Sequence, residues 1–187
     1  MDELIDILDA NANLTGETVM KSTAHEKGLF HQTVHIWFYT KKGEILLQQR
    51  GKNKKTFPLL WDVSVAGHIG AGEPIEISAL REIEEEIGLQ ISQQELHKIG
   101  VFKSIQKHSN TLIDCEFHHT FITELKVPLH RLKKQESEVE NLKLIAINLL
   151  KSELTDKENN SYVPHKAPYY EVILKKILEK INAQPNP

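Results

Sequence analysis

Two alternating sets of apolar side chains predict a strand near the start of this chain. One set consists of Val34, Ile36 and Phe38, and the other of Trp37 and Tyr39 together with His35. A strand that is apolar on both sides is typical of one covered on both faces. The pair Lys42-Gly43 then predicts a turn, and residues 44–49 predict the return strand.

Helical spacing predicts two longer helices further along. The first covers about residues 75–87 and ends at Gly88, because glycine commonly terminates helices. The second covers about 168–182. The remaining pattern predicts strands at 61–66, 97–106, 111–124 and 139–147, a loop at 126–137 and a short helix at 148–156.

This order of elements predicts an α/β fold with a mixed sheet between helices. The 187 residues are enough for one domain with a complete core. Residues 1–24 are expected to form a short helix, with Leu4, Ile5 and Leu8 on one face, and a connecting segment. Residues 25–157 form the predicted main domain, and 158–187 supply a C-terminal helix that packs on it.

Composition narrows the possible partners. The chain is 40% hydrophobic and 26% charged, with a formal net charge of −3, so a nucleic-acid partner is disfavoured. The most apolar stretch, Leu144–Leu150, is too short to span a membrane. With Cys115 as the single cysteine and an acidic start in place of a signal peptide, we expect a cytoplasmic protein.

Three glutamates of the first predicted helix fall on one side. Glu82, Glu85 and Glu86 lie within an arc of about 100° at helical spacing. Clustered carboxylates repel one another, and Mg²⁺ or Mn²⁺ would remove that repulsion. A bound cation would also neutralise phosphate charge and activate water. The alternative is an acidic helix face exposed to solvent.

The spacing around these glutamates is more specific than the helix itself. The segment from Gly67 to Leu89 fits G-x5-E-x7-R-E-U-x-E-E-x-G-U, with U apolar, at every position. This is the Nudix box, and the chain resembles Nudix hydrolases over about 25–150.

The resemblance implies an α/β/α sandwich that hydrolyses a nucleoside diphosphate linked to another group, X. By position, Glu82, Glu85 and Glu86 would hold the metal together with the carbonyl of Gly67. Arg81 would orient a carboxylate through charge-assisted hydrogen bonds, and Glu73 would brace the loop.

A second resemblance lies outside the box. The runs Leu46-Leu47-Gln48-Gln49-Arg50 and Ser64-Val65-Ala66-Gly67-His68 are similar to those of type I isopentenyl-diphosphate isomerases, which belong to the same superfamily. This resemblance implies that Arg50 and Lys54 contact the substrate diphosphate. It also implies a metal site formed by His25, His31, His68, Asp114 and Glu116.

The chain differs from the isomerases at the residues that determine the isomerase reaction. The isomerase cysteine is replaced by Ala66, and Cys115 is no obvious substitute because alternation turns it away from Asp114 and Glu116. The isomerases also typically lack the full box that is intact here. The histidines therefore keep two interpretations, a second metal site with Glu116 or ordinary packing and hydrogen bonding.

Several other side chains remain open at this stage. Glu138 is the first choice for a general base outside the box and Glu136 the second, and a solvated acidic turn is the alternative. Adjacent His118 and His119 should point to opposite faces of their strand. Trp37 and Trp61 could stack on a base, although core packing is the commoner role of such residues.

These observations favour a cytoplasmic, Mg²⁺- or Mn²⁺-dependent hydrolase that cleaves a diphosphate bond in a small molecule. An isopentenyl-diphosphate isomerase-like enzyme and a non-catalytic ligand-binding module are the alternatives. The basic loop over 50–57, which contains Arg50 and Lys54, is expected to border the same cleft as the glutamates; a solvated basic loop is the other interpretation.

Overall fold

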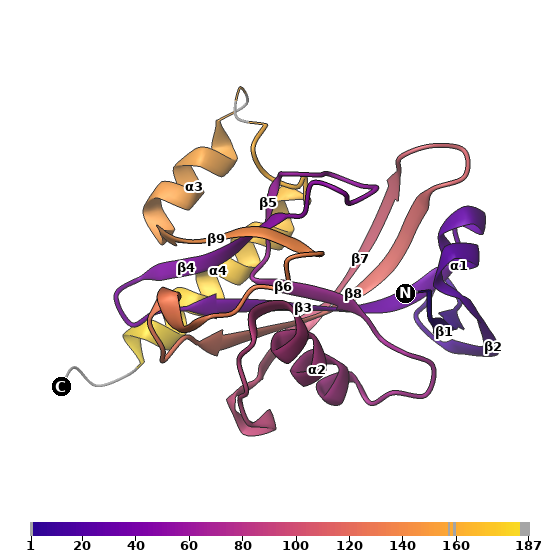
Figure 1. Cartoon of the computed structure of the whole chain (residues 1–187), viewed down its shortest axis with the longest axis horizontal. Coiled ribbons are helices and arrows are strands. Elements are labelled where there is room, and N and C mark those ends of the chain that lie inside the picture. The colour runs from indigo at the N-terminus through magenta and orange to yellow at the C-terminus, as the bar shows by residue number, and fades with distance from the viewer. Residues whose placement is uncertain (1, 157, 159, 184–187) are drawn as a thin grey trace.

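A mixed sheet with helices on both faces forms the protein (Figure 1). The computed structural model describes residues 2–156, 158 and 160–183. Within this part, the strands are β1 (Leu4–Leu8), β2 (Leu14–Met20), β3 (Phe30–Tyr39), β4 (Glu44–Arg50), β5 (Trp61–Asp62), β6 (Val65–His68), β7 (His97–Lys107), β8 (Ile113–Glu124) and β9 (Val139–Ala146). The helices are α1 (Lys21–Lys27), α2 (Ile75–Ile87), α3 (Ile147–Thr155) and α4 (Ala167–Asn182), with short 3-10 turns at Gln93–Glu95 and Leu129–Arg131.

The strand β3 organises the sheet. It runs parallel to β8, with His31 beside Glu116 and Thr33 beside His118. It runs antiparallel to β6, which sets His35 beside Ala66. The strands β7 and β8 form a long antiparallel hairpin, and β4 pairs with both β5 and β9. The sheet is therefore mixed, as the sequence predicts.

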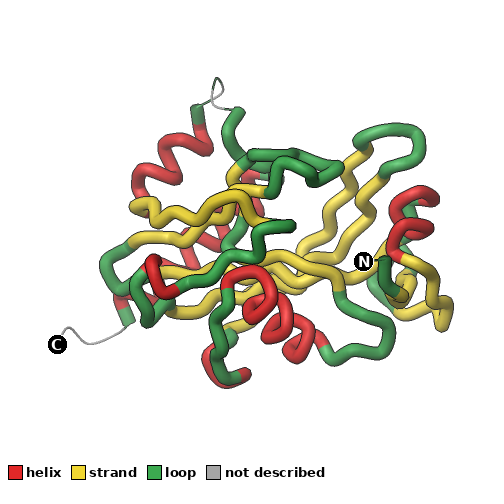
Figure 2. Tube along the Cα trace, in the orientation of Figure 1, coloured by secondary structure: helices red, strands yellow, loops and turns green. Residues whose placement is uncertain are grey.

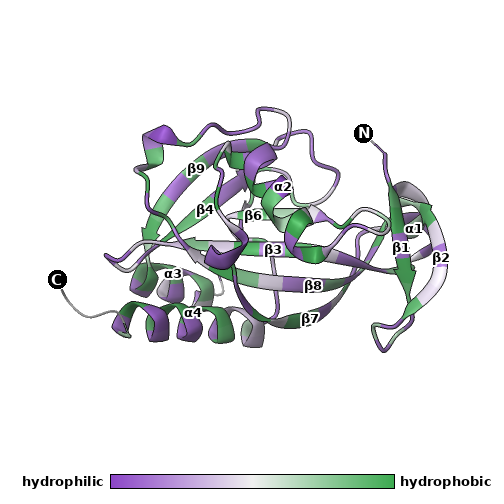
Figure 3. Cartoon of the chain, turned by 90° about the horizontal axis from the view of Figure 1, so that it is seen from below, coloured by the Kyte–Doolittle hydropathy of each residue, from purple (hydrophilic) through white to green (hydrophobic). Residues whose placement is uncertain are grey.

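The two faces of β3 serve two different cores. Ile36 and its alternate neighbours pack against Ile83 of α2. Trp37 and Tyr39, on the opposite face, pack against Ile173 of α4. Figure 3 shows α2 on one side of the sheet and α3 and α4 on the other. This arrangement confirms the predicted α/β/α sandwich and the strand covered on both faces.

The prediction for the N-terminus is wrong. In place of a helix, the first residues form β1, which pairs with β2 and β3 and buries Ile5 and Ile7. Long-range pairing with β3 thus outweighs the local helical spacing of the apolar residues. Figure 2 shows the β1–β2 hairpin at one end of the sheet, beside α1.

The other elements lie close to their predicted positions. The predicted strand over 61–66 is divided into β5 and β6, because the first pairs with β4 and the second with β3. The C-terminal helix ends at Asn182, and residues 184–187 of the predicted last segment lie outside the described residues. None of the helices in the described part of the chain has the length and apolar content needed to cross a membrane.

Candidate functional site

Arg81 fastens the loop before α2 to the helix. Its guanidinium donates two hydrogen bonds of 3.0 Å to the carboxylate of Glu73 and one of 3.1 Å to the carbonyl of His68. It also contacts Glu82 at 2.7 Å and Glu85 at 3.3 Å. These hydrogen bonds lower the pKa of Glu73. A single cation therefore holds the loop and two box carboxylates in place, and its geometry agrees with the expected orienting role.

The three box glutamates have different environments. Glu85 is the most open, with 48% of its side chain exposed. Glu82 is buried, and burial raises its pKa despite the charge of Arg81. Glu86 is also buried and accepts hydrogen bonds from Gln48 Nε2 at 2.9 Å and from the Ala66 amide at 3.1 Å. Burial and the charge of Glu82 raise the pKa of Glu86 to about 8.

A divalent cation fits this group because it would offset the cost of ionising two buried, neighbouring carboxylates. The side chain of Glu82 reaches from the helix to β6 and fills the space beside Gly67. A Cβ atom built on Gly67 would overlap the carboxylate of Glu82. The backbone of Gly67 thus lies directly beside a box carboxylate, as a shared metal site would require.

The basic loop borders a cleft of about 660 Å³ next to this group. Arg50 and Lys54 both line the cleft, together with Gly67 and Glu138. Lys54 forms an ion pair with Glu138. The structure therefore brings the two expected diphosphate ligands and the first-choice base to one cleft. Glu136, the second choice, is exposed and pairs with Lys134 at 2.7 Å.

Arg50 is also part of the cleft's internal framework. It donates to Asp62 Oδ2 at 3.0 Å and to the carbonyl and hydroxyl of Thr56, both at 3.1 Å. Asp62 accepts a second side-chain contact from His165 Nε2 at 2.9 Å. Burial alone would raise the pKa of Asp62, but His165 and Arg50 hold it below its usual range.

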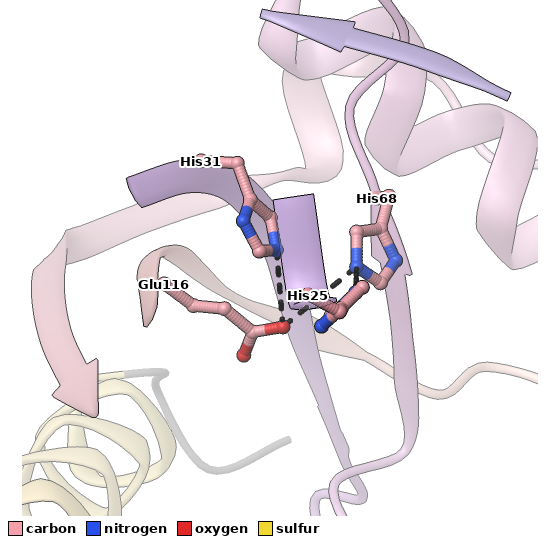
Figure 4. A group of neighbouring side chains, drawn as sticks. All are labelled: His25, His31, His68 and Glu116. Atoms are coloured by element: carbon pink, nitrogen blue, oxygen red, sulfur yellow. Dashed lines mark hydrogen bonds and ion pairs between the residues drawn. The ribbon is translucent and has the colours of Figure 1, made fainter. Parts of the chain in front are cut away.

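Of the five residues in the metal site implied by the isomerase resemblance, four come together in space (Figure 4), and three of these four line the cleft. One ligand atom from each of four residues lies within 4.8 Å of every other, in the group His25, His31, His68 and Glu116. The Nε2 atoms of His25 and His68 are 3.1 Å apart. Glu116 Oε1 is 3.5 Å from His31 Nε2 and 3.7 Å from His68 Nε2.

The second nitrogens of two rings are held in place. His25 Nδ1 contacts Asp114 at 2.7 Å, and His31 Nδ1 lies 2.9 Å from the carbonyl of Leu29. Within the described residues, His31 Nε2 is buried without a hydrogen-bond partner. Such outer partners orient metal-binding imidazoles, so this group fits a divalent cation. Asp114 bridges His25 and His108 (2.8 Å) and thus stands behind the converging atoms.

The polar side chains of the cleft meet because alternate residues of β3 and β8 point to the same face of the sheet. Neighbouring strands place His31, Thr33 and His35 of β3 beside Glu116, His118 and Thr120 of β8. Sequence reasoning did not assign His35 or His165 to the site. The alternating polar residues inside two otherwise apolar strands were the available signal for His35, whereas His165 lies in an irregular segment that no periodicity describes.

Adjacent side chains on β8 separate as alternation predicts. His118 Nδ1 contacts Thr33 Oγ1 at 2.7 Å, on the cleft side. His119 is buried and does not line the cleft, and the charge of Glu76 on α2 acts on it. Burial lowers the pKa of each ring to about 4. Cys115 is buried, and burial raises the pKa of its thiol.

Both tryptophans already have packing partners within the protein. Trp37 is buried in the core and donates a hydrogen bond of 2.9 Å to Tyr169. Lys143 covers the ring of Trp61, with its Nζ 4.1 Å from the ring centroid. The structure therefore favours packing roles for both.

Comparison with known proteins identifies the superfamily. The NUDIX domain family matches residues 29–166. The chain belongs to the Nudix family. An uncharacterized Nudix hydrolase from Clostridium acetobutylicum is 32% identical over 205 residues, which cover 95% of this chain and 98% of that protein.

Both resemblances seen in the sequence are supported by relatives. Isopentenyl-diphosphate Delta-isomerase 2 from Photorhabdus laumondii is 33% identical over 185 residues, which cover 98% of this chain and 95% of that protein. The crystal structure of a MutT NUDIX hydrolase from Burkholderia pseudomallei matches the fold with a TM-score of 0.56 and 17% identity, over 79% of this chain and 98% of that one. The predictions of a Nudix fold, an isomerase-like subgroup and a hydrolase of diphosphate bonds are confirmed.

Proposed function

We propose that this Nudix protein is a Mg²⁺-dependent hydrolase that cleaves the diphosphate bond of a nucleoside diphosphate-X or a related organic diphosphate. The observation that carries the proposal is the arrangement of Arg81, Glu82 and Gly67. One guanidinium joins the box loop to two carboxylates, and one of these lies against the glycine backbone. This arrangement leaves Glu85 open toward solvent, where a ligand can reach it.

The chain's own residues divide the task. Glu82, Glu85 and Glu86, with the carbonyl of Gly67, would hold Mg²⁺ or Mn²⁺, since hard oxygen ligands suit these ions. When bound, such ions neutralise diphosphate charge and activate a water molecule. Arg81 and Glu73 keep the carboxylates oriented.

The cleft residues would supply the remaining parts. Arg50 and Lys54 would hold the diphosphate by charge-assisted hydrogen bonds. Glu138 would accept a proton from the attacking water. The ion pair between Glu138 and Lys54 holds this base beside the side chain that would bind the diphosphate.

An isomerase-like activity on isopentenyl diphosphate is the second candidate. The group of His25, His31, His68 and Glu116 favours it, because the isomerases that the chain resembles bind a metal with the aligned residues. Imidazole ligands suit Zn²⁺ better than Mg²⁺. Ala66 argues against this activity, because no thiol is available at the position of the isomerase cysteine.

The test is a conservative change of the exposed carboxylate. Glu85→Gln should reduce turnover of a hydrolysable nucleoside diphosphate-X at least about a hundredfold, because it removes a metal ligand and keeps the shape of the side chain. Turnover is measured as phosphate-containing product over a panel of nucleotide sugars and dinucleotides at limiting Mg²⁺. The matched control is Glu84→Gln, since Glu84 is exposed on the same helix and its carboxylate accepts a hydrogen bond from Gln90 at 2.6 Å, away from the box carboxylates. If Glu85→Gln turns over substrate as fast as the wild type at limiting Mg²⁺, the proposal is wrong.

A further inference from the structure

Asp114 is the one expected metal ligand that the structure does not bring to the converging atoms. Those atoms, shown in Figure 4, belong to a set that we call the histidine group: His25, His31, His68 and Glu116. Both carboxylate oxygens of Asp114 are engaged elsewhere. Its Oδ1 contacts His25 Nδ1 at 2.7 Å, and its Oδ2 contacts His108 Nε2 at 2.8 Å. The structure therefore disagrees with the five-ligand site that the isomerase resemblance implies.

The ring of His25 separates Asp114 from the converging atoms. Asp114 contacts Nδ1 of this ring, whereas Nε2 of the same ring lies 3.1 Å from His68 Nε2. A carboxylate behind a metal-binding imidazole orients the ring and raises its basicity without binding the ion. Asp114 thus occupies the place of an outer partner.

His108 is fixed at the turn of the β7–β8 hairpin. Its backbone amide donates to the carbonyl of Leu112 at 3.0 Å. Its ring meets that of Phe57 edge-on, with centroids 5.0 Å apart. Since Phe57 belongs to the basic loop between β4 and β5, two separate segments hold the imidazole whose Nε2 faces Asp114. Neither resemblance assigns a role to His108.

The distances between the converging atoms fit a tetrahedral ion. Bonds of about 2.0–2.1 Å place neighbouring ligands about 3.3 Å apart in a tetrahedron and about 2.9 Å apart in an octahedron. The two Nε2 atoms of His25 and His68 are 3.1 Å apart, and Glu116 Oε1 lies 3.5 Å from His31 Nε2 and 3.7 Å from His68 Nε2. The other oxygen of Glu116 faces His118 Nδ1 at 3.6 Å, so Glu116 offers a single ligand atom.

We infer that His108 holds Asp114 outside the ligand set, so that the histidine group binds its ion through four residues and selects Zn²⁺ over Mn²⁺ and Mg²⁺. Four ligands in a tetrahedron, three of them imidazoles, suit Zn²⁺. A second carboxylate would add an oxygen ligand and a further position, which suits Mn²⁺ or Mg²⁺. His108 is a positioning residue in this arrangement, because it acts through Asp114.

Cobalt(II) reports the number of ligands. Four-coordinate Co²⁺ absorbs visible light more strongly than Co²⁺ with five or six ligands, and excess Mg²⁺ occupies the Nudix box. With one equivalent of Co²⁺, the wild type and Asp114→Asn should both give the intense four-coordinate spectrum, and Glu116→Gln should not. Asp114→Asn should bind Zn²⁺ about tenfold to a hundredfold more weakly than the wild type, because it loses an outer partner and no ligand. A weak spectrum or no Co²⁺ binding in the wild type, or an altered spectrum in Asp114→Asn, would overturn the inference.

Variants of His108 test its positioning role. Displacement of Co²⁺, followed through the same spectrum, gives the relative affinities for Zn²⁺ and Mn²⁺. His108→Ala releases one oxygen of Asp114, which should weaken the spectrum and reduce the preference for Zn²⁺ over Mn²⁺ about tenfold. His108→Gln should behave as the wild type, because the amide nitrogen of glutamine takes the place of Nε2 and still donates. A wild-type spectrum and preference in folded His108→Ala would show that His108 has no such role.

His97→Ala is the matched control. His97 is half-buried like His108, but it lies at the other end of β7 and outside the histidine group. Its substitution should change neither the spectrum nor the metal preference, and an effect equal to that of His108→Ala would refute the assignment. Thermal melting checks that each variant is folded. If His108→Ala is not, His108→Asn takes its place, because the shorter amide does not reach Asp114.

The inference stands apart from the proposed hydrolysis. Every measurement of metal binding is made without substrate, and Glu85→Gln should keep the four-coordinate spectrum while losing turnover. Loss of the spectrum in Glu85→Gln would place the bound Co²⁺ in the box and overturn the inference. An unchanged spectrum in a protein that hydrolyses no diphosphate would overturn the proposed function alone.

Discussion

The carboxylate of Glu82 occupies the space that a side chain at Gly67 would need. A Cβ atom at this position would overlap all three carboxylate atoms of Glu82. Because these atoms form the flexible end of a side chain, Glu82 can swing aside at little cost to the fold. Doing so would remove it from the proposed metal site.

Gly67→Ala should therefore separate activity from stability. We expect kcat/KM to fall at least about tenfold and the Mg²⁺ concentration for half-maximal activity to rise, with a change in Tm of only a few degrees. Gly70→Ala is the control in the same loop, because its Cβ would lie at an ordinary 3.4 Å from Glu73. Unchanged Mg²⁺ dependence in Gly67→Ala would contradict a role of Glu82 in metal binding.

The raised pKa of Glu86 predicts an unusual pH dependence of stability without metal. Its folded value of about 8 exceeds the ordinary 4.5, so folding favours the protonated form between these limits. The free energy of unfolding should therefore fall as pH rises from about 5 to 8, by at most about 1.4 kcal/mol per pH unit. Melting curves in EDTA measure this.

The variant Glu86→Gln should flatten that dependence and melt higher than the wild type at pH 8. Mg²⁺ should stabilise the wild type at pH 8, because a cation favours the ionised carboxylate. The same pH slope in both proteins would show that another group is responsible.

A direct contact of Lys54 with the diphosphate predicts a loss that salt does not abolish. Lys54→Ala should reduce kcat/KM by about tenfold or more, at both low and high ionic strength. Lys52→Ala is the matched control, since Lys52 has the same charge in the same loop but does not line the cleft. A loss under threefold that vanishes at high salt would indicate only a remote charge effect.

Arg50→Ala tests the second cation of the same contact. We expect a similar loss of kcat/KM together with a lower Tm, because the buried carboxylate of Asp62 loses the arginine that binds it and keeps only the contact with His165 among its side-chain ion-pair partners in the described residues. Comparison with Lys54→Ala separates diphosphate binding from support of the cleft. Normal kcat/KM in a folded Arg50→Ala variant would exclude Arg50 from diphosphate binding.

The absence of a thiol at Ala66 predicts no isomerisation of isopentenyl diphosphate. Glu116 lacks the cysteine partner that the isomerases use, because Ala66 occupies that position. Cys115 cannot replace it, because this buried residue lies on the opposite face of β8 from Glu116. Incubation with isopentenyl diphosphate and Mg²⁺ or Mn²⁺, followed by chromatography of the products, measures this directly. Formation of allylic diphosphate at enzyme-like rates would contradict the prediction.

Sequence and structure agree best where one local signal decides the element. The helix α2 was predicted over its full length from the single period of its apolar residues and from the glycine at its end. In the structure, Gly88 adopts a left-handed φ of 64° at that end. The N-terminal strand β1 was missed because it depends on pairing with β2 and β3, which the apolar spacing within the first residues does not reveal.

The site shows the same division. The Nudix box and the basic loop are each a continuous stretch of sequence. The residues Glu82, Glu85, Glu86 and Lys54 could therefore be singled out directly. The contact between Asp62 and His165 joins residues more than a hundred positions apart, and no spacing rule connects them. Such pairs become visible only when the strands and the segment before α4 are folded together.

The parallel register of β3 and β8 also determines how this protein can diverge. Substitutions at His31, Thr33 and His35 alter the side chains on one surface of β3 while leaving Val34 and Ile36, which pack in the core with α2, unchanged. A one-residue insertion within β3 would instead exchange the two sets, burying imidazoles under the helix and turning aliphatic side chains into the cleft. Selectivity in this scaffold can therefore be altered by point substitution, whereas a change of length within the strand would destroy the site and the core together.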